Sequence, residues 1–161
     1  MPKEYSDLED KIVALTKLAA CPLSKDQIEI KYLPVPHKRP SSLPKDTQAV
    51  YCFFHETTCL KVGKAGPKSG PRFTSHHYYC KAPSTLAKSI LGGKSRMLTL
   101  LKQEFHEEFL ALDEQTIGPW IEKHTARLNV LIPAAAGPHV LSLIEAFLQC
   151  QMNPLFEGGN Q

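Results

Sequence analysis

The C-terminal third of this chain constrains its fold most strongly, because it is almost free of charge. Between residues 128 and 156 the only Asp, Glu, Lys or Arg is Glu145. The heptapeptide ARLNVLI at residues 126–132 alternates in polarity and predicts a strand. Residues 139–150 are strongly apolar and predict a helix, which Asn153 and Pro154 end. The sequence therefore predicts a strand, a turn and a helix at the C-terminal end.

The preceding segments predict more strands and helices. The apolar run AVYCFF at residues 49–54 and the run CLKV at residues 59–62 flank the turn HETT, a pattern typical of a β-hairpin. Residues 84–91, 95–105 and 113–124 predict helices. We therefore expect an α+β domain over residues 47–161, with an enlarged helical middle section at residues 80–125.

The N-terminal part differs in composition. Residues 6–20 predict a helix, but residues 33–44 hold four prolines, which block both helix continuation and sheet pairing. We expect residues 1–46 to form a helix and a proline-rich arm attached to the main domain.

The composition excludes several classes of protein. The 161 residues are 42% hydrophobic and 22% charged, so the chain can bury a core. No apolar run approaches the roughly 18 residues of a membrane helix, and the acidic N-terminus is unlike a signal peptide. The five cysteines form no CxxC pair, so we expect reduced thiols. A cytoplasmic protein without contact to a membrane fits these features.

Positive charge is concentrated in one segment. Residues 57–103 contain nine Lys or Arg and no Asp or Glu, whereas residues 104–122 contain six acids and no Lys or Arg. Two solvated faces of opposite sign would explain this pattern. A cationic surface for a polyanion, most simply nucleic acid, is the alternative and the hypothesis that we follow.

Glu145 is the most informative single residue. A carboxylate in an apolar helix loses hydration unless a cation or strong hydrogen-bond donors compensate it. It can share a narrow exposed stripe with Ser142 and Gln149, at i−3 and i+4. The alternative is a functional carboxylate, for example a metal ligand.

The glycine-rich segment at residues 63–71 is a second candidate for chemistry. Glycines allow a phosphate to approach the backbone, and Lys61, Lys64 and Arg72 supply positive charge nearby. The order of residues does not match a Walker A motif. A zinc site that uses His55, Cys59 and the residues from His76 to Cys80 is an alternative that this spacing leaves open.

Together, these motifs resemble the GIY-YIG nuclease superfamily over roughly residues 48–157. AVY at residues 49–51 stands where the family has G-I-Y, and KVG at residues 61–63 stands where it has Y-I-G. Arg72 and His76 occupy the positions of the catalytic Arg and, in some branches, a His. Glu145 falls in the metal-binding helix, and a proline follows it nine residues later. Two positions depart from the pattern: Lys61 replaces the usual Tyr, and Glu157 replaces the usual Asn.

The resemblance implies a small three-stranded antiparallel sheet flanked by helices, and a divalent-metal-dependent DNA endonuclease. Tyr51 would act on the attacking water as general base or orienting group, with Lys61 as an alternative proton acceptor. Arg72 would hold the scissile phosphate, His76 would contact it, and Glu145 would bind Mg²⁺ or Mn²⁺. We expect Tyr51, Lys61, Arg72 and Glu145 to converge on one concave, basic face.

The implied partner is DNA, most simply double-stranded, and a homodimer on DNA would place two active sites on the two strands. Further basic residues are candidates for nucleic-acid contacts: Lys64, Lys68, Lys81, Lys88, Lys94 and Arg96. A catalytically inactive nucleic-acid-binding module and a ribonuclease or toxin on the same site are the alternatives.

Overall fold

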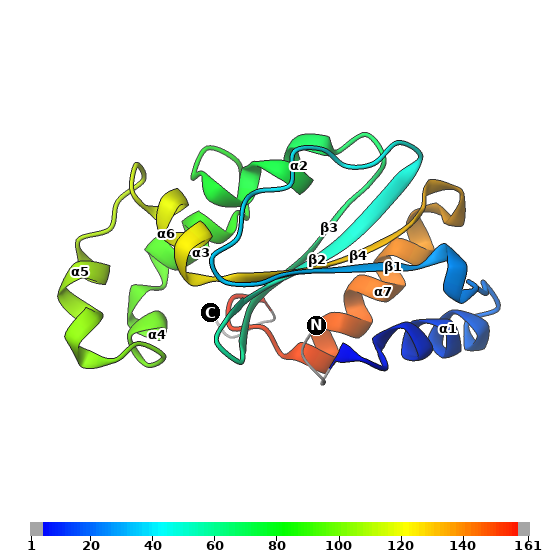
Figure 1. The fold of residues 1–161 in the computed structure, drawn as a ribbon, viewed down its shortest axis with the longest axis horizontal. Coiled ribbons are helices and arrows are strands. Elements are labelled where there is room, and N and C mark those ends of the chain that lie inside the picture. Colours follow the sequence, from blue (N-terminus) through cyan, green and yellow to red (C-terminus); the bar gives the residue numbers. More distant parts are fainter. Residues whose placement is uncertain (1–4, 158–161) are drawn as a thin grey trace.

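The computed structural model describes residues 5–157, and in this range the chain folds into an α+β domain around one antiparallel sheet. The sheet contains β1 (Glu29–Leu33), β2 (Thr47–His55), β3 (Thr58–Ala65) and β4 (Ala126–Pro133), in the spatial order β1-β4-β2-β3. Helices cover both faces of the sheet (Figure 1). The α+β class is therefore confirmed, but the sheet of the described residues has four strands instead of the expected three.

The fourth strand comes from the segment for which we expected an arm. β1 pairs along its length with β4, from Glu29 opposite Leu131 to Leu33 opposite Arg127. The four prolines that argued against pairing begin only at position 34, directly after this strand ends. Residues 5–46 therefore contribute a strand to the sheet rather than standing apart from it.

The central hairpin agrees with its sequence pattern. β2 and β3 are joined through Glu56, which adopts a positive φ of 50° in the turn. Both strands extend beyond the expected ranges, because residues such as Gln48 and Lys64 continue the pairing although they are polar. Side chains alternate between the two faces of the sheet, as the period of two requires.

The helices of the described residues are α1 (Leu8–Leu18), α2 (Gly70–Thr74), α3 (Leu86–Gly92), α4 (Lys94–Leu98), α5 (His106–Leu110), α6 (Ile117–His124) and α7 (Gly137–Met152). Short 3₁₀ turns are η2 (Lys25–Gln27), η3 (His76–Tyr78), η4 (Gln103–Phe105) and η5 (Ala134–Ala136). The Gly118-Pro119 pair lies in the first turn of α6, where proline is tolerated, so it does not interrupt that helix. α7 ends at Asn153, which adopts the left-handed conformation expected of a C-terminal cap. No helix of the described residues is long and apolar enough to cross a membrane.

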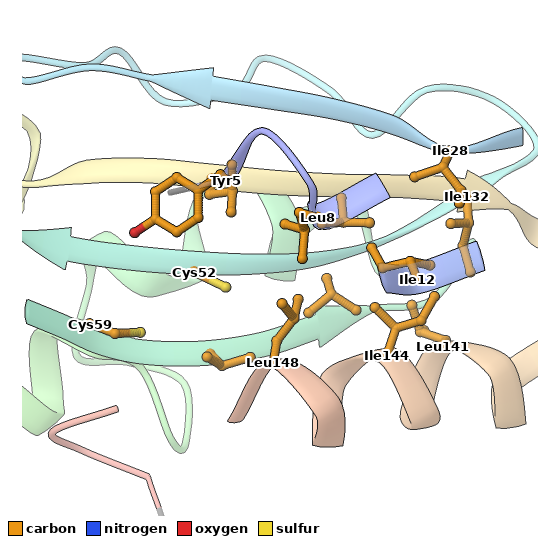
Figure 2. Packing of buried hydrophobic residues seen from close by; sticks show 14 of the residues in the cluster. Tyr5, Leu8, Ile12, Ile28, Cys52, Cys59, Ile132, Leu141, Ile144 and Leu148 are labelled. Atoms are coloured by element: carbon orange, nitrogen blue, oxygen red, sulfur yellow. The ribbon is translucent and has the colours of Figure 1, made fainter. Parts of the chain in front are cut away.

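Two apolar clusters lie on opposite faces of the sheet. α1 and α7 cover one face, and α2, α3 and α6 cover the other, while α4 and α5 lie beyond one end (Figure 1). In the first cluster Ile12 of α1 lies beside Ile144 of α7, and Cys52 of β2 belongs to the same cluster (Figure 2). The second cluster contains Phe53 of the same strand and Ile121 of α6. The helix at residues 8–18 is therefore part of the core.

Candidate active site

Tyr51 lies in the middle of β2, between Gly63 on β3 and Asn129 on β4. Its side chain is fully buried, and its ring crosses the edge strand at Gly63. A Cβ at position 63 would lie 2.7 Å from a ring carbon and 2.8 Å from the hydroxyl oxygen of Tyr51, so only glycine leaves this room. The hydroxyl oxygen thereby reaches the backbone of the edge strand, 3.4 Å from the Lys64 carbonyl.

Two side chains donate hydrogen bonds to the Tyr51 hydroxyl oxygen. Arg72 Nε lies 3.3 Å from it, and His77 Nε2 lies 2.6 Å from it. The backbone N–H of Leu86 donates to His77 Nδ1 at 3.2 Å, which places the single proton of the neutral imidazole on Nε2. The imidazole is neutral because burial, with help from the charge of Arg127, lowers the pKa of His77 to about 2. His77 is therefore a donor to Tyr51 and does not accept its proton.

The pKa of Tyr51 reflects opposing causes. Burial raises the pKa of this hydroxyl, while the hydrogen bond and the charge of Arg72 and the charge of Arg127 oppose the rise. The Glu145 carboxylate adds to the rise. In its neutral form the oxygen already accepts two hydrogen bonds, so only the phenolate has a further lone pair for a proton.

Arg127 places a positive charge beneath the site. Its guanidinium is fully buried and donates to the carbonyl of Phe73 at 2.7 Å and to Asn129 Oδ1 at 2.8 Å. Its Cζ lies 5.1 Å from the centre of the Tyr51 ring, in a cation–π arrangement. No carboxylate of the described residues pairs with it. The charge of Arg127 is therefore compensated by dipoles and aromatic rings alone.

Arg72 reaches the solvent. It lies in α2, which begins within the last residues of the glycine-rich segment and has Gly70 and Pro71 in its first turn. Its side chain is exposed, and apart from Nε its guanidinium bonds to none of the described residues. The two terminal nitrogens therefore remain available for an anion.

Glu145 projects from α7 toward the edge strand. Its Oε2 lies 2.7 Å from Lys64 Nζ, and the same ammonium donates to Ser142 Oγ at 2.9 Å. The Glu145 side chain is 18% exposed, so it is neither fully solvated nor buried without a partner. The carboxylate is thus compensated by an ammonium of this chain, and Ser142, which the exposed-stripe interpretation placed on the same side of the helix, lies beside it.

The predicted site residues come from both faces of the sheet. Tyr51 and Arg72 lie on the face that α2 covers, whereas Lys64 alternates with Gly63 and extends toward α7 and Glu145. The expected single concave face is therefore wrong, because α7 packs on the opposite side of the sheet from α2. The two halves meet at the edge strand, where Tyr51 touches the Lys64 backbone and Glu145 touches the Lys64 side chain.

Lys61 shares the face of Tyr51, but its side chain is buried and its ammonium donates to Glu157. The residues just before Glu157 continue along the edge strand, since the amide of Leu155 donates to the Cys59 carbonyl and that of Phe156 to the Leu60 carbonyl. The two positions that depart from the GIY-YIG pattern are thus in direct contact. A Lys61 held in this way is not a free proton acceptor.

His76, to which the resemblance assigned a contact with the scissile phosphate, forms no hydrogen bond to Tyr51 among the described residues. α2 ends at Thr74 and the chain continues into the tighter turn η3, which changes the side-chain directions. His77 bonds to Tyr51 instead, and His76 lines a shallow depression with Tyr79 and Lys81. We did not assign His77 to this site from the sequence; its position directly after His76 is the feature of the sequence that could have indicated it.

The candidate nucleic-acid contacts fall into two groups. Lys64, Lys94 and Arg96 have intramolecular partners: Lys94 Nζ donates to the carbonyls of Leu110 and Leu112, and Arg96 donates to that of Leu155. The remaining three, Lys68, Lys81 and Lys88, are exposed and form no ion pair within the described residues.

The alternative zinc site is not assembled. His55 stacks against Trp120 and His77 bonds to Tyr51, so the proposed ligands point to different partners. Within residues 5–157 no group of three or more His, Cys, Asp or Glu is arranged to hold a metal ion. A metal at Glu145 would thus have one carboxylate ligand, an arrangement that suits Mg²⁺, which keeps most of its waters.

Comparisons with known proteins add nothing to this geometry. No protein-family model, no curated protein and no solved structure matches the chain.

Proposed function

We propose that this protein hydrolyses phosphodiester bonds in DNA with a divalent metal ion, as the GIY-YIG nucleases that its motifs resemble do. The observation that carries the proposal is the arrangement at the Tyr51 hydroxyl. Arg72 bonds to Tyr51 through one nitrogen and exposes the other two, while the same hydroxyl contacts the Lys64 carbonyl and the Lys64 ammonium contacts Glu145. A phosphate at Arg72 would thus lie beside a proton acceptor, with the carboxylate across the edge strand β3.

In this proposal Arg72 binds the scissile phosphate. A guanidinium matches two phosphate oxygens with parallel hydrogen bonds, and its charge stabilises the negative charge that develops in the transition state. The bond from Nε to Tyr51 holds the guanidinium in place before substrate binds. Binding then costs less side-chain conformational entropy.

Tyr51 accepts a proton from the attacking water as the phenolate. The N–H groups of Arg72 and His77 both point at its oxygen, so they stabilise negative charge there. His77 is a positioning residue, because it acts on the reaction only through this hydrogen bond. Lys61 maintains the edge strand through Glu157, and it takes no direct part in the proton transfer.

Glu145 would hold the metal, with the Ser142 hydroxyl beside it. A bound Mg²⁺ or Mn²⁺ would supply positive charge for the leaving oxygen. Because Lys64 Nζ now contacts the carboxylate at 2.7 Å, the ammonium must move aside or share this ligand. Its flexible four-carbon chain allows it to turn toward a DNA phosphate instead.

The experiment is incubation of the purified protein with supercoiled plasmid, single-stranded DNA and RNA, in Mg²⁺ or in EDTA. We expect cleavage of DNA in Mg²⁺ alone, loss of cleavage in Glu145→Gln, and a loss of about 10²- to 10³-fold in Arg72→Ala, the range for one lost transition-state donor. Lys17→Ala is the control, since Lys17 is exposed on α1, which covers the face of the sheet away from Tyr51, and it forms no ion pair among the described residues. Full activity of Glu145→Gln would refute the metal site, and cleavage of RNA alone would make the protein a ribonuclease.

A second candidate function is a nucleic-acid-binding module without catalysis. The Lys64–Glu145 ion pair favours this second function, because the Lys64 ammonium is bound to the carboxylate that the metal would need as a ligand. In that case DNA would bind with a steep dependence on salt but stay intact in both Mg²⁺ and Mn²⁺.

A further inference from the structure

A row of four paired residues crosses the whole sheet on the face of Tyr51. Lys31 on β1 pairs with Asn129 on β4, Asn129 pairs with Tyr51 on β2, and Tyr51 pairs with Gly63 on β3. Directly paired residues point to the same face, and neighbouring strands lie about 5 Å apart. Asn129 and Lys31 therefore lie about 5 and 10 Å from Tyr51, on the side away from the edge strand β3.

A groove of about 420 Å³ opens over this end of the row. Lys31 and Asn129 line it from the sheet, Lys38 and Arg39 line it from the proline-rich segment, and Phe73 lines it next to Arg72. Of the described residues that line the groove, none is acidic. Lys31 contacts Glu29 at 3.0 Å in an exposed pair, and Arg39 contacts Glu122 at 2.9 Å, while Lys38 has no carboxylate partner among the described residues.

The floor of the groove carries an oriented hydrogen-bond donor. Asn129 is 98% buried, and its Oδ1 accepts from Arg127 Nε at 2.8 Å, which directs the amide nitrogen away from Arg127. That amide nitrogen donates to none of the described residues and is not among the polar atoms that are sealed off without a partner. It is therefore accessible within the groove. Behind it, the guanidinium of Arg127 has no carboxylate partner, so its charge adds to the positive potential there.

We propose that this groove binds the backbone phosphates of the nucleic-acid strand next to the scissile phosphate, with the Asn129 amide, Lys31 and Lys38 as their contacts. The inference rests on the proposed function, and it extends that function by giving the strand a direction across the sheet. The strand would run from Arg72 at the β3 edge, past Phe73, to the segment of residues 38–44 over β1. The proline-rich segment is then one wall of the binding site.

The first experiment compares two double variants with the same change in charge. Lys31→Glu with Lys38→Glu alters the groove, and Lys11→Glu with Lys17→Glu alters α1 on the opposite face of the sheet. The two pairs match, because Lys31 and Lys11 each sit in an exposed ion pair, while Lys38 and Lys17 form none within the described residues. Thermal unfolding of both variants verifies that each is folded.

The readout is the salt dependence of binding to a labelled oligonucleotide, measured by fluorescence anisotropy in EDTA. Each lost phosphate contact reduces the slope of log K against log salt by about 0.7 for single strands and about 0.9 for duplex, so two contacts reduce it by about 1.4 to 1.8. We expect this reduction in the groove variant alone. Equal slopes in both variants would overturn the inference, because the charges would then act only through the net charge of the protein.

The second experiment locates the phosphates. Single neutral methylphosphonates are placed at successive positions on either side of the cleaved bond. We expect the wild-type protein to lose affinity at one or two positions on one side of that bond, and the groove variant to lose nothing further there. If the groove variant cleaves DNA and loses affinity at the same methylphosphonate positions as the wild-type protein, the inference is overturned and the proposed function stands. Failure of the wild-type protein to bind or cleave any nucleic acid would instead overturn the proposed function, and the groove assignment with it.

Discussion

The two faces of the sheet are built from different kinds of residue, although the same strands supply both. Toward α1 and α7, β2 presents Val50, Cys52 and Phe54, and the buried cluster there is apolar. Toward α2 and α6 it presents Tyr51 and Phe53, and these rings surround the buried guanidinium of Arg127. Burying polar groups requires that each finds a partner, so the second face is more demanding to build than the first.

This difference indicates that stability and chemistry are divided between the two faces. The face toward α1 and α7 buries few polar side chains, among them Thr16 and Gln48, so burial of apolar surface dominates its contribution to folding. The opposite face instead fixes Tyr51, His77 and Arg127 in one hydrogen-bonded and cation–π arrangement. Such an arrangement holds a reactive group in place before substrate binds, which is the requirement for transition-state stabilisation. The following predictions test this division, from the largest expected effect to the smallest.

The largest effect concerns the buried charge pair on the polar face. Glu157→Gln leaves the Lys61 ammonium, whose side chain is 4% exposed, without its partner, and we expect a loss of about 3–5 kcal/mol in the free energy of unfolding. Lys61→Met leaves the Glu157 carboxylate, which is 25% exposed and can regain water, so its loss should be smaller. Urea denaturation measures both.

The double variant with Lys61→Met and Glu157→Gln is the control for that pair. It removes both charges, so we expect it to recover most of the stability that Glu157→Gln loses. Equal losses of unfolding free energy in Glu157→Gln and Lys61→Met would mean that burial does not keep the unpaired Lys61 ammonium from water.

On the apolar face, Ile12→Ala should lower the free energy of unfolding by about 2–5 kcal/mol, because Ile12 is completely buried and its removal leaves a cavity. The cleavage rate at a temperature where the variant stays folded should match that of the wild-type protein, since α1 lies on the far face from Tyr51. Ala14→Gly on the exposed side of the same helix is a control for helix propensity, with an expected loss of about 1 kcal/mol. A fully stable Ile12→Ala would show that residues 5–46 are an appendage after all.

The sequence predicted the apolar face better than the polar one. The strands at residues 49–54 and 126–132 and the helix at 139–150 are apolar or alternating, and burial enforces such patterns. Arg127 and Asn129 alternate with apolar residues in β4, a pattern that normally marks a solvated face. They are buried because α2 and α6 cover that face, which no local pattern records.

The candidate site was predictable where strand periodicity controls direction. Tyr51 and Lys61 share a face because they lie on paired strands, and Arg72 follows from the glycine-rich segment. That His77 and not His76 bonds to Tyr51 depends on where the five-residue helix α2 ends. The exact end of a helix is poorly determined by the local sequence. The partnership of Lys61 with Glu157 spans 96 positions, so only the folded chain reveals it.

The pH dependence of cleavage tests the role of Tyr51 on the polar face. Burial raises the pKa of this hydroxyl above its ordinary value, so the phenolate is the minor form at neutral pH. Below that pKa its fraction rises tenfold per pH unit, and the single-turnover rate at constant Mg²⁺ should rise by about tenfold per unit between pH 6 and 9. Tyr51→Phe should lower the rate and flatten the profile. A level profile for the wild-type protein would exclude the phenolate as the proton acceptor.

The smallest effect concerns the edge strand, where the two faces meet at Lys64. Removing the ammonium with Lys64→Met frees the Glu145 carboxylate from a contact of 2.7 Å, so a divalent cation no longer competes with it. Lys64 is 37% exposed, and partly exposed pairs of this kind contribute about 0.2–1 kcal/mol, so Mn²⁺ should bind about one and a half to five times more tightly. Isothermal titration calorimetry without DNA measures this change, and Lys68→Met in the neighbouring exposed loop is the control for net charge. Weaker Mn²⁺ binding in Lys64→Met would mean that Lys64 holds the Glu145 carboxylate in position for the metal. In that case Lys64 of the edge strand would be part of the metal site and would not compete with the cation for the carboxylate.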